Sequence, residues 1–144
     1  SGSNKVLKSM NRRYTKEDYL KLYDSIRTKV KNASVTTDII VGFPGETNDE
    51  FNKTYEFLKE IELSQMHVFK YSPRKGTPAA TMENQIDPQM KQLRSDKLLN
   101  LNKENFEKSI ILSFFQLTRS SLSQTTIALL LFQPSLLRIS VAMI

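Results

Sequence analysis

Residues 35–47 read VTTDIIVGFPGET, and this stretch decides the fold class of the 144-residue chain. Six of its first seven residues are β-branched, a composition typical of a strand that is covered on both faces in a parallel sheet. Two glycines and a proline then predict a turn, and Thr47 with Glu50 three residues later predicts a capping box at the start of a helix. The stretch therefore predicts a strand that runs directly into a helix.

The sequence on both sides of this stretch predicts further helices and one more strand. Residues 66–71 alternate between apolar and polar, which predicts a second strand, and residues 72–78 form a loop. Apolar residues at helical spacing predict helices at about 4–10, 16–31, 48–62 and 88–107. A strand–helix–strand unit of this length is a right-handed parallel crossover, but two parallel strands do not form a stable sheet alone. The predicted fold class is therefore α/β, a partial and incomplete (β/α) barrel with parallel strands and flanking helices.

The composition restricts the chemistry that the chain can perform alone. It contains no cysteine, which excludes disulfides, a thiol nucleophile and an iron–sulfur cluster bound by this chain. Its single histidine, His67, leaves little for a histidine metal site or a Ser–His–Asp triad. The net charge of +6 is compatible with an anionic partner such as RNA, although a mildly basic solvated surface gives the same value. The first residues do not resemble a signal peptide, so the expected location is cytoplasmic.

The composition changes abruptly near residue 108. All 15 acidic residues lie in residues 1–108, whereas residues 109–144 contain no Asp, Glu, Lys or Gly. Three interpretations compete: a transmembrane helix over 120–137, a buried subdomain, or an out-of-frame or unrelated sequence. Pro134 and many Ser, Thr and Gln residues interrupt the apolar run, which makes it a weak membrane span. We therefore expect a functional portion at 1–108, an aberrant apolar and serine-rich tail at 109–144, and no membrane association.

The junctions between predicted strands and helices carry the candidate functional residues, because chemistry in β/α barrels sits where strands end. The GFPGET turn at 42–47 places glycines where the backbone turns or approaches a ligand, and a plain turn explains the same residues. Asp38 interrupts an apolar strand, so its carboxylate needs either a ligand or a structural partner. Four basic side chains either grip phosphate or carboxylate groups or remain solvated: Arg12, Arg13, Arg74 and Lys75. These residues alone indicate a part of an α/β enzyme with an anionic substrate or ligand.

Three stretches in order resemble the radical S-adenosylmethionine (SAM) methylthiotransferases. They are SGSNKVLKSMNRRYT at residues 1–15, TTDIIVGFPGET at 36–47 and HVFKYSPRKGTPAA at 67–80. The sequences NRRYT at 11–15 and HVF at 67–69 most resemble the branch that acts on threonylcarbamoyladenosine in tRNA. The resemblance covers about residues 1–108 and stops at the change in composition. It implies a fragment from the later part of the radical SAM barrel.

The resemblance also implies an activity for the complete protein. Members of this branch add a methylthio group to carbon 2 of threonylcarbamoyladenosine at position 37, in the anticodon loop of tRNA. One 4Fe–4S cluster cleaves SAM reductively to a 5′-deoxyadenosyl radical and a second cluster helps supply sulfur, and the cysteines that hold both are absent from this chain. The implied cofactors are therefore SAM and, in the complete protein, 4Fe–4S clusters. We expect no catalytic residue, no metal ligand and no turnover in this chain alone.

The family pattern further implies which residues contribute to the SAM pocket. The expected cofactor-binding residues are Ser1, Gly2, Ser3, Arg12, Asp38, Gly42, Phe43, Pro44, Phe69 and Tyr71. The first three match the end of the family's fourth strand, and Arg12 is the candidate partner of the SAM carboxylate. The next four match the fifth strand and its loop near adenosine, and the last two match the sixth strand, whose backbone groups meet adenine. The general pattern G-x-I-x-G-x-x-E fits only loosely, because Asp38 stands at its first glycine and Glu46 falls one residue late.

Two alternatives stay open. A sister methylthiotransferase that acts on isopentenyladenosine in tRNA or on a ribosomal protein shares these motifs. A non-catalytic basic α/β module that binds RNA or a partner protein shares the composition.

Overall fold

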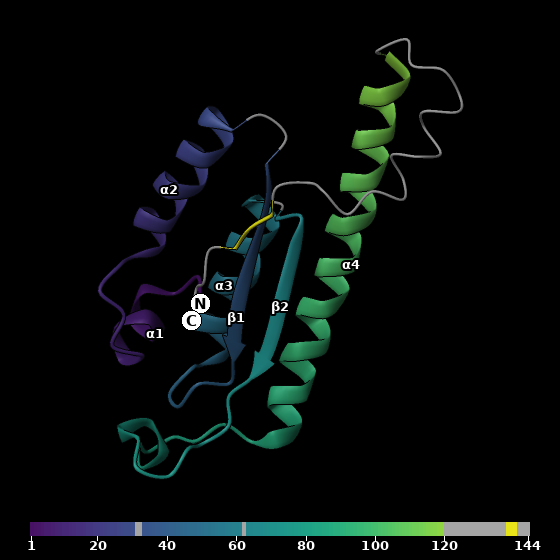
Figure 1. Ribbon diagram of the computed structural model, residues 1–144. Helices are drawn as coiled ribbons and strands as arrows, with labels where there is room; N and C mark the ends of the chain where they lie inside the picture. The colour runs from purple at the N-terminus through teal and green to yellow at the C-terminus, as the bar shows by residue number, and fades with distance from the viewer. Residues whose placement is uncertain (31–32, 62, 120–137, 141–144) are drawn as a thin grey trace.

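The computed structural model describes residues 1–30, 33–61, 63–119 and 138–140 of the chain. Their order is α1 (Asn4–Ser9), α2 (Lys16–Lys29), β1 (Ser34–Val41), α3 (Asn48–Ile61), β2 (Gln65–Lys70), the 3₁₀ turn η1 (Pro78–Ala80), α4 (Pro88–Arg119) and β3 (Arg138–Ser140). Figure 1 shows the helices around a small sheet. The helices and the two strands that the sequence predicts are present in the predicted order, and the α/β class is confirmed.

The strands form one parallel sheet in the order β2-β1-β3 (Figure 1). In the register of β1 and β2, Asp38 lies opposite His67. On the other edge, β3 pairs with the start of β1, with Ser34 opposite Arg138. β3 was not among the predicted strands, because a strand of three residues carries no periodic signal that a sequence pattern would reveal.

One face of the sheet carries the hydrophobic core. Alternate residues of β1 point toward it: Val35, Ile39 and Val41 are at most 2% exposed. The helices cover this face with Tyr19 of α2, with Phe51, Phe57, Leu58 and Ile61 of α3, and with Leu98 and Leu101 of α4. On the opposite face, Asp38 is only half-buried and Phe69 is 50% exposed. Among the described residues this second face is buried at Thr36 and more exposed toward the carboxyl end of the sheet, as the inside face of a barrel would be without its other strands.

The ends of the first two helices follow from local side chains. Ser3 caps α1, and Asn11 adopts a left-handed φ of 57° just beyond it. The N–H groups of Asn11 and Arg12 then bond back to carbonyls of α1 at 3.0 and 2.9 Å, which is a Schellman cap. Thr15 and Asp18 form a complete capping box at the start of α2.

The capping box predicted for α3 forms only in half. The N–H of Glu50 donates to the hydroxyl of Thr47 at 3.2 Å. The carboxylate of Glu50 does not return to Thr47, because it accepts hydrogen bonds from the Ser3 hydroxyl and from Lys53. A tertiary partner thus replaces the reciprocal bond and ties α3 to the first residues of the chain.

α4 differs from the sequence prediction in its end and in its buried face. It continues to Arg119, past the predicted end near residue 107. The apolar Leu93 is 64% exposed, whereas Arg94 is only 4% exposed. Arg94, Leu98 and Leu101 share one side of the helix because they are four and three residues apart. An arginine therefore occupies a buried position that the apolar pattern did not predict.

None of the described helices combines the length and the apolar character that crossing a membrane requires. The run at 120–137 that was weighed as a membrane span lies outside the described residues. The division of the chain at residue 108 stays a prediction.

Candidate functional site

The loops that follow β1 and β2 meet at the carboxyl edge of the sheet. After β1 the chain makes a type II turn, with Pro44 at its second position and a φ of 79° at Gly45. The N–H of Glu46 closes the turn by donating to the carbonyl of Phe43 at 3.0 Å. The N–H of Gly45 donates to the carbonyl of Asn84 in the loop after β2, also at 3.0 Å. The two junctions that the sequence singled out are thus joined directly.

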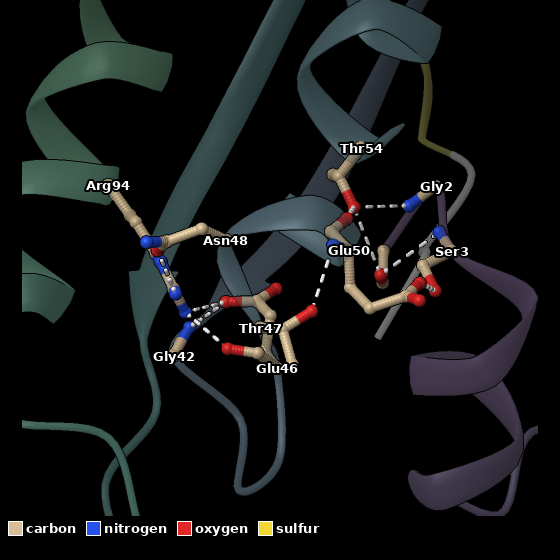
Figure 2. A network of polar contacts seen from close by, with 10 residues as sticks. Gly2, Ser3, Gly42, Glu46, Thr47, Asn48, Glu50, Thr54 and Arg94 are labelled. Atoms are coloured by element: carbon tan, nitrogen blue, oxygen red, sulfur yellow. Dashed lines mark hydrogen bonds and ion pairs between the residues drawn. The ribbon is translucent and has the colours of Figure 1, made fainter. Parts of the chain in front are cut away.

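A buried ion pair holds this turn against α4 (Figure 2). Oε2 of Glu46 lies 2.8 Å from Nη1 of Arg94, and the two side chains are 1% and 4% exposed. The same Nη1 donates to the Glu46 carbonyl at 2.9 Å, and Nη2 donates to Oδ1 of Asn48 at 2.9 Å. Oε2 also accepts the N–H of Gly42 at 2.7 Å. One carboxylate therefore connects the end of β1, the turn and α4, which gives Glu46 a clear structural role.

The protonation of Glu46 reflects two opposed effects. Burial raises the pKa of its carboxyl, while the Gly42 N–H and the Arg94 guanidinium lower it. The net direction is upward, so desolvation outweighs the favourable contacts. The second oxygen, Oε1, is buried without a hydrogen-bond partner in the described part of the chain.

The first three residues pack against α3 on the other side of its first turn (Figure 2). Oγ1 of Thr54 accepts the N–H of Gly2 at 3.1 Å and lies 3.2 Å from Oγ of Ser1. A Cβ on Gly2 would lie 2.9 Å from Cα of Thr54 and 3.0 Å from Cβ of Phe57, so this close approach requires glycine. Ser3 caps α1 and donates to a carboxylate of α3. In this structure Ser1, Gly2 and Ser3 hold α1 against α3.

An aromatic pair and a lysine lie at the same edge of the sheet. The rings of Phe43 and Tyr71 meet edge to face, with centroids 5.2 Å apart. Nζ of Lys91 lies 5.1 Å from the centroid of the Tyr71 ring. The stem of Lys91 crosses Gly42 so closely that a Cβ there would lie 2.4 Å from Cγ of the lysine. Gly42, Phe43 and Tyr71, three of the expected cofactor-binding residues, therefore lie close together.

Asp38 and Phe69 lie on the open face of the sheet. The side chain of Asp38 is half-buried, and its carboxylate forms no hydrogen bond or ion pair with the residues that the structure describes. Phe69 comes from the neighbouring strand and is half exposed. The surface that would face the inside of a barrel thus presents a carboxylate and an aromatic ring.

Arg12 follows α1, where its backbone takes part in the helix cap. Its side chain is exposed and forms no ion pair among the described residues. Its charge reaches Tyr14, since burial raises the pKa of the tyrosine hydroxyl and Arg12 opposes that rise. The guanidinium is therefore available to an external anion.

Residues 1–58 match the family model described as the Radical SAM superfamily. The matched family is the radical SAM superfamily. The match includes β1, its turn and most of α3, and a parallel sheet with flanking helices agrees with a partial radical SAM barrel.

Sequence identity to individual proteins narrows the comparison to methylthio-tRNA enzymes. The chain is 48% identical over 109 residues to the tRNA-2-methylthio-N(6)-dimethylallyladenosine synthase of Clostridium tetani, which covers 76% of this chain and 24% of that protein. It is 50% identical over 100 residues to the enzyme of the same name from Alkaliphilus oremlandii, with 69% and 21% covered. It is 49% identical over 102 residues to the threonylcarbamoyladenosine tRNA methylthiotransferase of Bacillus subtilis, with 71% and 23% covered. The chain spans about a quarter of the length of the curated relatives it matches.

These likenesses support the predicted family of radical SAM methylthiotransferases. They do not single out the threonylcarbamoyladenosine branch, because the dimethylallyladenosine name is the more frequent among these relatives.

Radical SAM enzymes imply SAM and 4Fe–4S clusters as cofactors. A cluster does not fit this chain, which has no cysteine thiolate to bind iron. The residues that the structure describes also include no group of three His, Cys, Asp or Glu that could hold a metal ion. A polar ligand such as SAM fits better, because the half-buried carboxylate of Asp38 has no partner among the described residues. The N–H of Gly42, by contrast, is already bound to Glu46.

Sequence reasoning missed two residues of this site, Arg94 and Lys91. Arg94 had a detectable signal, because it lies four residues before Leu98 in the stripe that is buried. A charge in such a stripe indicates a buried partner. Lys91 had none, because its position depends on the way α4 crosses Gly42.

Proposed function

We propose that this chain is a segment of a radical SAM methylthiotransferase that modifies tRNA. The observation that carries the proposal is the 48% identity over 109 residues to a protein named as a tRNA methylthio synthase. The radical SAM match over residues 1–58 supports it from an independent comparison. The arrangement of the loops supports it as well, because ligands of β/α barrels bind where the strands end.

In this proposal the segment forms a wall of the SAM pocket. SAM, when bound, supplies the radical and methyl-transfer chemistry of the family. Asp38 holds a polar group of its adenosine, and Arg12 pairs with its carboxylate. Phe69 covers the adenine ring, and backbone groups of Tyr71 meet its edge.

The remaining expected residues act as the frame of that wall. Gly42, Phe43 and Pro44 shape the turn that Glu46 and Arg94 hold in place. Ser1, Gly2 and Ser3 fix the preceding loop against α3. Because the cysteines for the clusters lie outside this chain, the chain alone does not turn over.

The proposed substrate is threonylcarbamoyladenosine at position 37 of the anticodon loop, and the proposed location is the cytoplasm. The NRRYT stretch at residues 11–15 and the HVF stretch at 67–69 favour this branch. A second candidate substrate is dimethylallyladenosine at the same position. The names of the relatives from Clostridium tetani and Alkaliphilus oremlandii favour that one.

The substrate is tested by analysing tRNA nucleosides from a strain that lacks the gene carrying this segment. Loss of the methylthio form of threonylcarbamoyladenosine alone supports the first candidate. Loss of the methylthio form of dimethylallyladenosine alone supports the second and overturns the first. If both methylthio nucleosides persist at their normal levels, the proposed function is wrong.

A further inference from the structure

The position of Lys91 is determined by packing along its whole length. Its stem lies against Gly42, whose φ of 73° and missing Cβ leave room for the lysine Cγ. Its ammonium group then lies over Tyr71, with Nζ 5.1 Å from the ring centroid. The ring of Tyr71 packs edge to face with Phe43, and the Tyr71 N–H donates to the Val41 carbonyl at 2.9 Å. The lysine charge is therefore held at the carboxyl edge of the sheet.

The donors gathered here have no acceptor among the described residues. None of the ion pairs in the described part of the chain includes Lys91. Asp87, one turn earlier on the chain, is engaged through Oδ1 by the N–H of Gln89 at 2.7 Å. The hydroxyl of Tyr71 is buried and unpaired within the same part of the chain. A buried donor without an acceptor is unfavourable. The Tyr71 hydroxyl, with a lysine ammonium over its ring, therefore indicates a ligand that brings oxygen acceptors.

We infer that Lys91 and the Tyr71 hydroxyl form a binding site for a phosphate group of the substrate RNA. A phosphate offers several acceptor oxygens and a negative charge, which suits one ammonium and one hydroxyl. Two further basic side chains, Arg74 and Lys75, are exposed in the loop that follows β2, three and four residues after Tyr71. Their positive charge would also attract a polyanion such as RNA. The inference rests on the proposed function, because it takes the bound phosphate to belong to tRNA.

The test measures binding of the 144-residue chain to a synthetic anticodon stem-loop RNA at several salt concentrations. Lys91→Gln is expected to weaken binding about tenfold and to reduce the slope of log affinity against log salt by about one. Tyr71→Phe is expected to weaken binding several-fold with an unchanged slope, since it removes a hydrogen bond and no charge. Circular dichroism verifies the fold of each variant, and if Lys91→Gln does not fold, Tyr71→Phe decides the outcome.

Lys97→Gln is the matched control. Lys97 also lies on α4 and also covers a ring, with Nζ 4.4 Å from the centroid of Tyr55. This substitution removes the same charge from the same helix, but away from the edge where the loops meet. It is expected to change affinity less than twofold. Equal effects of Lys91→Gln and Lys97→Gln would show general charge attraction and overturn the inference.

A titration with SAM in the absence of RNA distinguishes an RNA phosphate from the SAM carboxylate as the anion bound by Lys91. If Lys91→Gln weakens SAM binding and leaves the RNA salt slope unchanged, the anion is the SAM carboxylate and the phosphate assignment is wrong. Failure of the proposed function remains distinguishable, because it is read from nucleosides of the deletion strain and not from binding. A deletion strain that loses its methylthio nucleoside, combined with unchanged RNA binding of Lys91→Gln and Tyr71→Phe, overturns only the present inference.

Discussion

Replacing Arg94 with methionine should destabilise the chain strongly. The substitution keeps most of the side-chain volume but removes the partner of Glu46, whose side chain is 1% exposed. It also removes three hydrogen bonds, to the carboxylate and carbonyl of Glu46 and to Asn48. Removing one member of a buried ion pair costs about 3–5 kcal/mol, because the other charge is left buried without compensation. The equilibrium constant of unfolding should therefore rise by about two to more than three powers of ten.

The assay is urea unfolding of Arg94→Met in the original and in a Glu46→Gln background. The loss should be much smaller beside the neutral glutamine, because no charge is then stranded. It should also shrink on acidification. Without the guanidinium the pKa of Glu46 rises further, and a raised folded-state pKa gives stability that is present at low pH and is lost as pH rises. Lys97→Met is the control, with an expected effect near 0.5–1 kcal/mol. A loss below about 1 kcal/mol, or an equal loss in the Glu46→Gln background, would refute the stabilising role of the Glu46–Arg94 ion pair.

Three further outcomes follow from the same contacts. Gly2→Ala should destabilise the chain by about 1–3 kcal/mol through its clash with Thr54. Thermal unfolding of this variant beside the unsubstituted chain measures the loss, and an unchanged melting temperature would contradict it. Glu50→Gln should lower the free energy of unfolding at pH 7 and weaken its dependence on acid pH. The Ser3 hydroxyl and then Lys53 lower the pKa of Glu50, so the carboxylate stabilises the fold above about pH 4.5 and this stabilisation disappears as pH falls. An equal loss of stability on acidification in both proteins would contradict this. A chain cut to residues 1–108 should unfold over a broad range, because it loses β3 and exposes the edge of β1; a sharp two-state melting transition would count against that expectation.

Much of the fold could be predicted because its signals are local. The β-branched run before GFPGET marks β1, and Thr15 with the acids after it marks the start of α2. The elements that escaped prediction depend on contacts between distant residues. β3 forms by pairing with Ser34, and Glu50 leaves its own helix cap to meet Ser3.

The residues of the candidate site also differ in whether the sequence could indicate them. Resemblance brought Gly42, Phe43 and Tyr71 together, and the structure places them at one edge. The resemblance assigned no firm role to Glu46, because this residue falls one position later than the glutamate of the family pattern. In the structure its carboxylate accepts the N–H of Gly42 in its own loop. Lys91 could not be found from spacing, since its place depends on where α4 passes the end of β1.

The central claim is that these residues complete a SAM pocket whose iron-binding cysteines lie outside the chain. Reductive SAM cleavage, measured anaerobically together with bound iron and sulfide, tests it most directly. The 144-residue chain and the complete product of its gene are reconstituted side by side with iron and sulfide. We predict clusters and 5′-deoxyadenosine from the complete product, and neither from the 144-residue chain. Cluster binding by the chain itself, or a complete product that binds no cluster and leaves SAM intact, would contradict the account.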